Sequence, residues 1–167
     1  MNYEEKQRFR QWWMWAILLP SLGAPMGVAG YWAFAHYALG RTIPNLNPGS
    51  PDPGPALVIA FLALGAPLWM MWAAELRIRV RPDALHVSFF PFMRERRFLY
   101  SQILRAEART YNPVGEYGGW GLKGTGKNRA LNVSGNRGVQ LELVSGQRLL
   151  LGSQRPDELA AAINARR

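Results

Sequence analysis

The sequence predicts an α+β membrane protein in which a transmembrane helical hairpin precedes an antiparallel β domain. Residues 11–40 and 53–74 contain no charged residue. At about 1.5 Å per helical residue, each run can cross a hydrocarbon core of roughly 30 Å. From residue 75 onward, apolar and polar residues alternate as they do in half-buried strands. The net charge of +9 comes chiefly from arginines outside the two uncharged runs.

These observations divide the chain into two expected domains. Residues 1–76 form the membrane hairpin, with spans at about 12–39 and 56–75. The proline-rich segment 41–55 cannot hold a helix, so we expect it to be an extended loop that joins the spans on the outer face of the membrane. Residues 77–167 form a β domain in the cytosol.

The charges that flank the spans predict their orientation. The basic residues on the two flanks are Lys6, Arg8, Arg10, Arg77, Arg79 and Arg81. The connecting loop has Arg41 alone, so the positive-inside rule places both termini in the cytosol of a multi-pass protein of the bacterial inner membrane. A cleaved signal peptide is the alternative, with Ala33-Phe34-Ala35 as its cleavage site. The first uncharged run is too long for a usual signal core and begins with tryptophans, which favours the membrane span.

The β domain is predicted to contain about seven strands and a closing helix. The alternating stretches are 76–80, 85–89, 94–99, 106–111, a strand around Trp120, 129–134, 138–144 and 148–151. Ser153, Pro156 and two acidic residues mark a helix start near the C-terminus. Leu159 and Ile163 lie four residues apart and predict one apolar stripe on that helix. This order of elements is typical of an antiparallel barrel or sandwich with a helical plug.

Several short motifs resemble the bacterial pleckstrin-homology-like (PH-like) domains. The motifs are Tyr111-Asn112-Pro113, Tyr117-Gly118-Gly119-Trp120-Gly121, Gly138-Val139-Gln140-Leu141, Ser145-Gly146-Gln147, Gly152-Ser153 and Pro156-Asp157-Glu158-Leu159. In these families such a domain often follows a pair of membrane helices. The resemblance covers residues 76–167 and implies a PH-like β-barrel or sandwich with a C-terminal helix. It implies no activity, because these families share no catalytic set. Ala84 departs from the pattern, since glycine is usual there.

Catalytic motifs are weak in this sequence. Gly121 to Lys127 has the glycine-lysine spacing of a phosphate-binding loop, but Asn128 stands where that loop needs a Ser or Thr for Mg²⁺. A strand pattern follows where a helix is required, so we expect a hairpin loop. The chain has no cysteine, and His86 is the sole histidine of the β domain, which favours no metal site. We therefore expect neither enzymatic activity nor a cofactor.

Basic residues are the main functional signal of the β domain. The candidate contacts to anionic lipid are Arg77, Arg79, Arg81, Arg94, Arg96 and Arg97. The candidate loop contacts are Trp120, Lys123, Lys127 and Arg129. Basic clusters next to a span attract anionic headgroups with about 1 kcal/mol per residue. The simpler interpretation is that these arginines only set topology and solvate a strand.

The expected function is that of a membrane-anchored, non-catalytic interaction or regulatory module. It would present a basic PH-like domain at the cytosolic membrane surface for protein or anionic-lipid contacts. The alternative is an accessory subunit of a membrane transporter or enzyme complex. Expected partners are the lipid bilayer, anionic headgroups, other membrane proteins and a second copy of the chain. Nucleic acid is disfavoured, because the domain is tethered and has few exposed aromatics.

Overall fold

The computed structural model describes residues 3–42 and 51–167, which form two compact units. One unit joins the N-terminal residues through Phe9 to Ala73–Arg167, and the other is Arg10–Trp72. This division differs from the expected boundary after residue 76, because the N-terminal segment is part of the β unit. The charged segment before the first apolar helix, with Glu4 and Glu5 beside Lys6 and Arg8, is therefore a strand of the β unit.

The helical unit contains two long apolar helices. α1 (Trp12–Leu18), the π-helical turn η1 (Leu19–Gly23) and α2 (Ala24–Leu39) follow one another as a helix of 28 residues. The π turn contains Pro20, which has no N–H for the regular helical bond. α3 (Gly54–Ala73) has 20 residues. Both helices are long and apolar enough to cross a membrane. Residues 43–50 of the predicted loop 41–55 lie outside the described residues.

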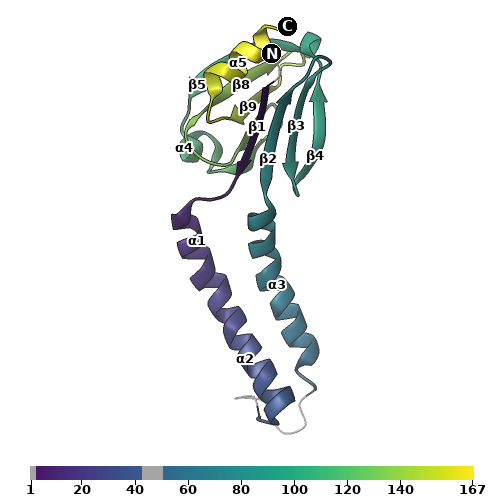
Figure 1. Ribbon diagram of the computed structural model, residues 1–167, viewed down its shortest axis with the longest axis vertical. Coiled ribbons are helices and arrows are strands. Elements are labelled where there is room, and N and C mark those ends of the chain that lie inside the picture. The colour runs from purple at the N-terminus through teal and green to yellow at the C-terminus, as the bar shows by residue number, and fades with distance from the viewer. Residues whose placement is uncertain (1–2, 43–50) are drawn as a thin grey trace. The chain divides into compact units, whose positions relative to one another are not determined.

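Sheet A is antiparallel and has the strand order β1-β2-β3-β4. Its strands are β1 (Tyr3–Arg8), β2 (Glu75–Val80), β3 (Leu85–Phe90) and β4 (Met93–Phe98). Figure 1 shows β1 beside β2, although the two strands are far apart in the sequence. The sequence does not predict β1, because its buried positions carry the polar residues Glu5 and Gln7 instead of an apolar alternation.

Sheet B has the strand order β5-β8-β9-β7-β6. Its strands are β5 (Ile103–Thr110), β6 (Gly121–Thr125), β7 (Asn128–Asn132), β8 (Arg137–Leu143) and β9 (Arg148–Gly152). β7 and β9 run parallel, so the prediction of a purely antiparallel domain is wrong for this pair. The described residues thus form nine strands in two sheets, and this α+β architecture is not shown to close into a barrel.

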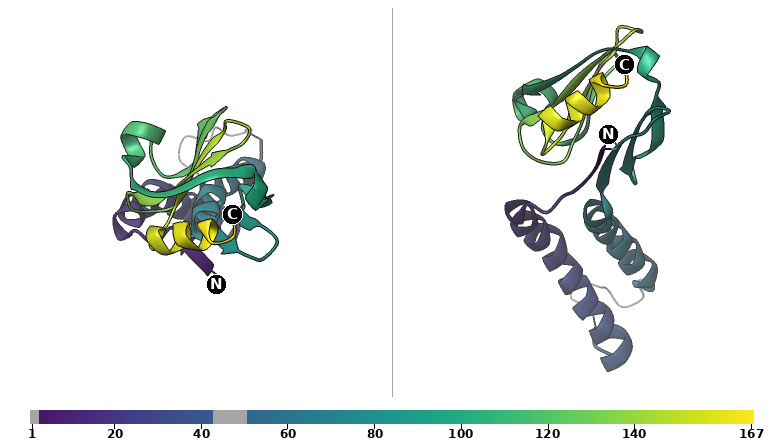
Figure 2. Two further views of the ribbon diagram at one scale, coloured as in Figure 1. Left: turned by 90° about the horizontal axis from the view of Figure 1, so that it is seen from above. Right: turned by 45° about the horizontal axis from the view of Figure 1, so that its top comes forward.

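The main core consists of the inner face of each sheet and one side of the C-terminal helix. The helix α5 (Pro156–Asn164) packs against β5 and β8 and lies along sheet B in Figure 2. Leu159 and Ile163 are fully buried, which confirms the predicted apolar stripe. The helix is capped at Arg155, not at Ser153, whose hydroxyl accepts a hydrogen bond from the Arg155 backbone N–H at 3.0 Å.

A smaller core covers the outer face of sheet B. The short helix α4 (Pro113–Tyr117) begins at Asn112, whose side chain accepts a hydrogen bond from the Gly115 N–H at 2.9 Å. Tyr111 and Tyr117 are buried with Ala130 and Leu150. The Tyr-Asn-Pro and Tyr-Gly-Gly-Trp-Gly motifs therefore build this second core. Gly118 ends the helix with a φ of +71°, a conformation that suits glycine.

Trp120 belongs to the same region. Its ring is partly buried, and Nε1 donates a hydrogen bond to the Gly135 carbonyl at 2.9 Å. The residue thus lies immediately before β6 and holds the segment to the loop that precedes β8. The glycines beside Trp120 predict that its large ring is at least partly buried, and the structure confirms this. The loop contact predicted for Trp120 stays a prediction.

Candidate functional site

The register of β4 distributes its arginines between two faces of sheet A. Arg96 lies opposite Val87, a core residue, so it is on the inner face. Arg97 lies opposite His86 and is on the outer face. A register shift between Val87 and Phe89 separates this pairing from the next one along the strands, Phe89 with Met93. The neighbouring arginines thus have different surroundings although the sequence presents them as one cluster.

The outer-face arginines of β2 are neutralised within the fold. Arg77 pairs with Glu75, and Arg79 Nη2 lies 2.5 Å from Glu95 Oε2. Arg8 Nε also lies 2.5 Å from Glu75 Oε2. Burial alone would raise the pKa of Glu75, but the hydrogen bonds from Arg77 and Arg8 lower it below its ordinary value. Arg77 and Arg79, which were predicted as lipid contacts, thus have acidic partners within the fold. The Arg8–Glu75 pair connects β1 to β2, and the Arg79–Glu95 pair connects β2 to β4.

His86 is buried on the same face and links two carboxylates. Nδ1 lies 2.8 Å from Glu95 Oε1, and Nε2 lies 3.1 Å from Asp83 Oδ2. The hydrogen bonds with His86 lower the pKa of both carboxyl groups. His86 thus ties the β2–β3 turn to β4, a role that a lone histidine in a strand pattern does not reveal. In residues 3–42 and 51–167, no cluster of three His, Cys, Asp or Glu side chains could hold a metal ion.

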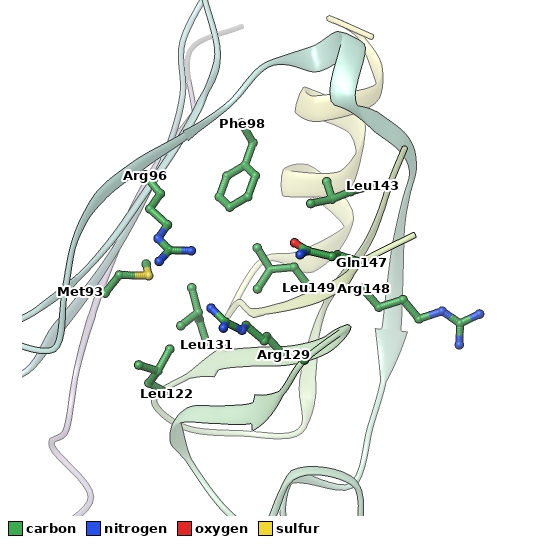
Figure 3. A pocket seen from close by; sticks show the side chains of 11 residues that line it. Met93, Arg96, Phe98, Leu122, Arg129, Leu131, Leu143, Gln147, Arg148 and Leu149 are labelled. Carbon is green, nitrogen blue, oxygen red and sulfur yellow. The ribbon is translucent and has the colours of Figure 1, made fainter. Parts of the chain in front are cut away.

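The inner face of β4 lines a cleft against sheet B (Figure 3). The cleft encloses about 40 Å³. Its lining residues come from β4, the β6–β7 hairpin and the β8–β9 connection, and they are Met93, Arg96, Phe98, Leu122, Gly126, Arg129, Leu131, Leu143, Gln147, Arg148 and Leu149. Arg129 pairs in register with Leu149, a core residue, so its side chain is on the inner face of sheet B.

Two arginines reach into this cleft from opposite walls. Figure 3 shows the guanidinium groups of Arg96 and Arg129 extended toward one another, whereas Arg148 points away. Arg148 Nε lies 3.4 Å from Glu142 Oε1. Within the described part of the chain, neither the Arg96 nor the Arg129 side chain has a hydrogen bond or an ion pair. Two like charges beside an apolar lining repel one another, and an anion between them would turn that repulsion into attraction.

The other predicted contact residues lie elsewhere on the domain. Arg81 is exposed in the β2–β3 turn, where its backbone N–H donates to the Ala84 carbonyl at 3.1 Å. Arg94 is exposed on β4. Lys123 lies opposite Ala130 on the outer face of sheet B, and Lys127 lies in the turn between β6 and β7. The structure therefore brings together Arg96 and Arg129, which the sequence placed in separate groups.

The glycine-lysine motif is a hairpin, as predicted. β6, the turn Gly126-Lys127 and the start of β7 account for all of it, with Thr125 paired to Asn128. No helix follows the lysine, so the geometry of a phosphate-binding loop is absent from these described residues.

The opposite edge of sheet A contains a second polar cluster. Glu5 of β1 is 7% exposed and accepts hydrogen bonds from Gln7 Nε2 at 3.0 Å, Ser153 Oγ at 2.6 Å and the Gln154 backbone N–H at 2.7 Å. The Tyr3 hydroxyl also donates to Glu5. Burial and this hydrogen bond raise the pKa of Tyr3. Both oxygens of the Glu5 carboxylate are satisfied by groups of the same chain.

Comparison of the chain with models of known protein families, with curated proteins and with solved structures finds no match. The PH-like resemblance therefore stays a prediction from the motifs, and the functional argument depends on the geometry of the site.

Proposed function

We propose that this protein is a membrane-anchored, non-catalytic interaction or regulatory module whose basic PH-like domain contacts anionic lipid headgroups at the cytosolic face of the bacterial inner membrane. The observation that carries the proposal is the pair Arg96 and Arg129, two cations with no partner in the described chain. The short connection between the β unit and a helix that could span a membrane supports it. Only Ala74 separates α3 from β2.

Tethering makes weak contacts effective. With α3 in a bilayer, the β domain stays within a short length of chain of the headgroups, so their local concentration is high. A basic residue near an anionic surface contributes about 1 kcal/mol, and a few such residues are enough to hold a tethered domain against the membrane. Arg94 and Arg97, exposed on the same strand as Arg96, add to this attraction.

The order of elements supports the PH-like part of the proposal. A four-stranded antiparallel sheet precedes a second sheet, and the C-terminal helix packs on that second sheet. The Tyr-Asn-Pro and Tyr-Gly-Gly-Trp-Gly motifs each contribute a tyrosine to the second core under α4, which explains why the two motifs occur together.

Hydrogen exchange of the full chain in nanodiscs tests the lipid contact. We expect the amides of β4 and of the β6–β7 hairpin to exchange more slowly in discs with an anionic phospholipid than in neutral discs. High salt should remove the difference, because the Debye length falls from about 10 Å at 0.1 M to about 3 Å at 1 M. The triple variant Arg94→Gln, Arg96→Gln, Arg97→Gln should lose the difference at low salt. Equal exchange in both kinds of disc would contradict the proposal.

Reporter fusions test the topology independently. A reporter in the connecting loop should be active outside the cytosol, and one at the C-terminus should be active inside it. The opposite pattern would place the β domain away from the cytosolic leaflet.

A further inference from the structure

We infer that the cleft between β4 and the β6–β7 hairpin binds a phosphate monoester between Arg96 and Arg129. This inference rests on the proposed function and specifies its ligand chemistry: one dianionic phosphoryl group instead of negative surface charge in general. The monoester can belong to a lipid headgroup or to a free phosphate ester, and both sources present the same group to the two arginines.

The charge of the cleft matches a dianion. The two guanidinium groups reach into one space and have no carboxylate partner in the described residues. A phosphate monoester carries about −1.5 to −2 charges at pH 7, whereas a diester or a carboxylate carries one. Each guanidinium can donate two parallel hydrogen bonds to phosphoryl oxygens, and a monoester has three oxygens available for two such forks. A singly charged group would leave part of the repulsion between the arginines in place.

The arginines that line other parts of the domain show why this pair is distinctive. Arg79, Arg109 and Arg137 each make an ion pair with a carboxylate of the same chain. Arg148 lines the cleft but turns away from it toward Glu142. Arg81, Arg94 and Arg97 also have no ion pair in the described residues, but they do not line this cleft. Arg96 and Arg129 differ from them because their guanidinium groups meet in one space.

The walls of the cleft strengthen ionic contacts. Phe98, Leu122 and Leu131 place apolar surface beside the guanidinium groups, and Leu131 is fully buried. Arg96, Arg129 and Leu122 are themselves exposed, so the cleft is open to solvent, but apolar surface beside a charge still strengthens each charge-assisted hydrogen bond. The enclosed volume of about 40 Å³ is the space of a few water molecules, which suits one phosphoryl group better than a bulky headgroup ring.

The position of Arg96 also supplies a matched control. Arg97 is the next residue on the same strand and is also exposed to solvent, but it is on the outer face opposite His86. General attraction to anionic surfaces depends on both arginines alike. A phosphoryl site in the cleft depends on Arg96 and not on Arg97.

Binding to the full chain in a neutral detergent tests the inference. The probes are short-chain phosphatidate, which is a monoester, short-chain phosphatidylglycerol, which is a diester, and inorganic phosphate, with affinity measured by calorimetry. We expect phosphatidate to bind about tenfold tighter than phosphatidylglycerol. Arg96→Gln and Arg129→Gln should each weaken phosphatidate binding by about tenfold or more, since each removes charge-assisted hydrogen bonds. Arg97→Gln should change it by about twofold at most.

The outcomes separate the sources and the two proposals. Inorganic phosphate that binds as tightly as phosphatidate, and is weakened by the same two substitutions, identifies a free phosphate ester as the source. Phosphatidate that binds much more tightly than inorganic phosphate identifies the lipid. Equal affinity for the two phospholipids, or equal losses in Arg96→Gln and Arg97→Gln, overturns the cleft site and leaves the general lipid contact standing. If neither phospholipid binds and nanodisc exchange is also independent of lipid charge, both proposals fail.

Discussion

The two edge strands of sheet A, β1 and β4, both carry a charged side chain on the inner face, and the fold treats these charges in opposite ways. On β1, Glu5 is buried and accepts hydrogen bonds from both neighbouring β1 side chains and from the segment before α5. On β4, Arg96 reaches a cleft whose facing wall contributes two further arginines among the described residues, and of these Arg129 extends toward Arg96 while Arg148 points away.

The difference indicates which charge is structural. A buried carboxylate is stable only when hydrogen bonds replace its lost hydration, and Glu5 has them from groups separated by nearly the whole chain. This contact fastens the N-terminal strand, which continues into α1, to the C-terminal part of the β domain. A charge whose partners are all internal stabilises the fold, whereas the unpartnered Arg96 and Arg129 are available to an external anion.

The largest effect is expected when the Glu5 contact is removed. Glu5→Ala leaves Ser153 Oγ, the Tyr3 hydroxyl and the Gln154 N–H without their acceptor in a buried place. We expect a loss of about 3–5 kcal/mol in the free energy of unfolding of the β unit. Thermal unfolding of the full chain in detergent, followed by near-ultraviolet circular dichroism, measures it. Glu4→Ala is the matched control, because Glu4 is exposed and its carboxylate pairs with Lys6 at 3.4 Å on the surface; its effect should stay within about 0.5 kcal/mol. Similar losses in both variants would show that β1 is not held by Glu5.

An intermediate effect is expected for Trp120, which was a predicted ligand contact. The ring is partly buried and its N–H is hydrogen-bonded, so Trp120→Ala should cost about 2 kcal/mol, less than the 3–5 kcal/mol of a fully buried tryptophan. The same unfolding assay measures the loss, and phosphatidate binding should be unchanged at temperatures where the variant is folded. An unchanged unfolding temperature with weakened binding would make Trp120 part of the binding surface.

A smaller, pH-dependent effect is expected for Glu75. Its folded-state pKa is lowered, so its contribution to stability is full above the unfolded pKa near 4.5 and disappears as the pH falls through the folded pKa. Glu75→Gln should therefore cost about 1–2 kcal/mol at pH 7 and progressively less toward pH 3. Denaturant unfolding of both proteins across this range measures the difference. A constant difference at all pH values would contradict the ionised pairing with Arg8 and Arg77.

The smallest effect on stability is expected at the cleft. Arg96→Gln removes one of two facing like charges and no internal hydrogen bond, so the unfolding free energy should change by less than about 0.5 kcal/mol, in the stabilising direction. The same holds for Arg129→Gln. A loss comparable to that of Glu5→Ala would mean that Arg96 has an internal role and would remove the contrast between the two edges of sheet A.

Local sequence patterns predicted the helices and most strands correctly. An uncharged apolar run and a two-residue alternation are properties of neighbouring residues, so the two apolar helices, β2, β3 and the apolar stripe of α5 could be located from the chain alone. Arg96 and Arg129 were both recognised as candidate contacts, because exposed basic residues stand out in any strand pattern.

The sequence by itself therefore determined the apolar helices and the basic character of the β domain, and only the tertiary structure decided which charges find partners. β1 was missed because its core-facing residues are polar and are satisfied by Ser153 and Gln154, which no local pattern connects to it. β7 and β9 are parallel because β8, which lies between them in the sequence, pairs with the other edge of β9 in the antiparallel direction. Arg96 faces Arg129 because the pairing of β4 with β3 and of β7 with β9 places both side chains on the inner faces of their sheets. Register is a property of paired strands and cannot be read from the sequence of one strand alone.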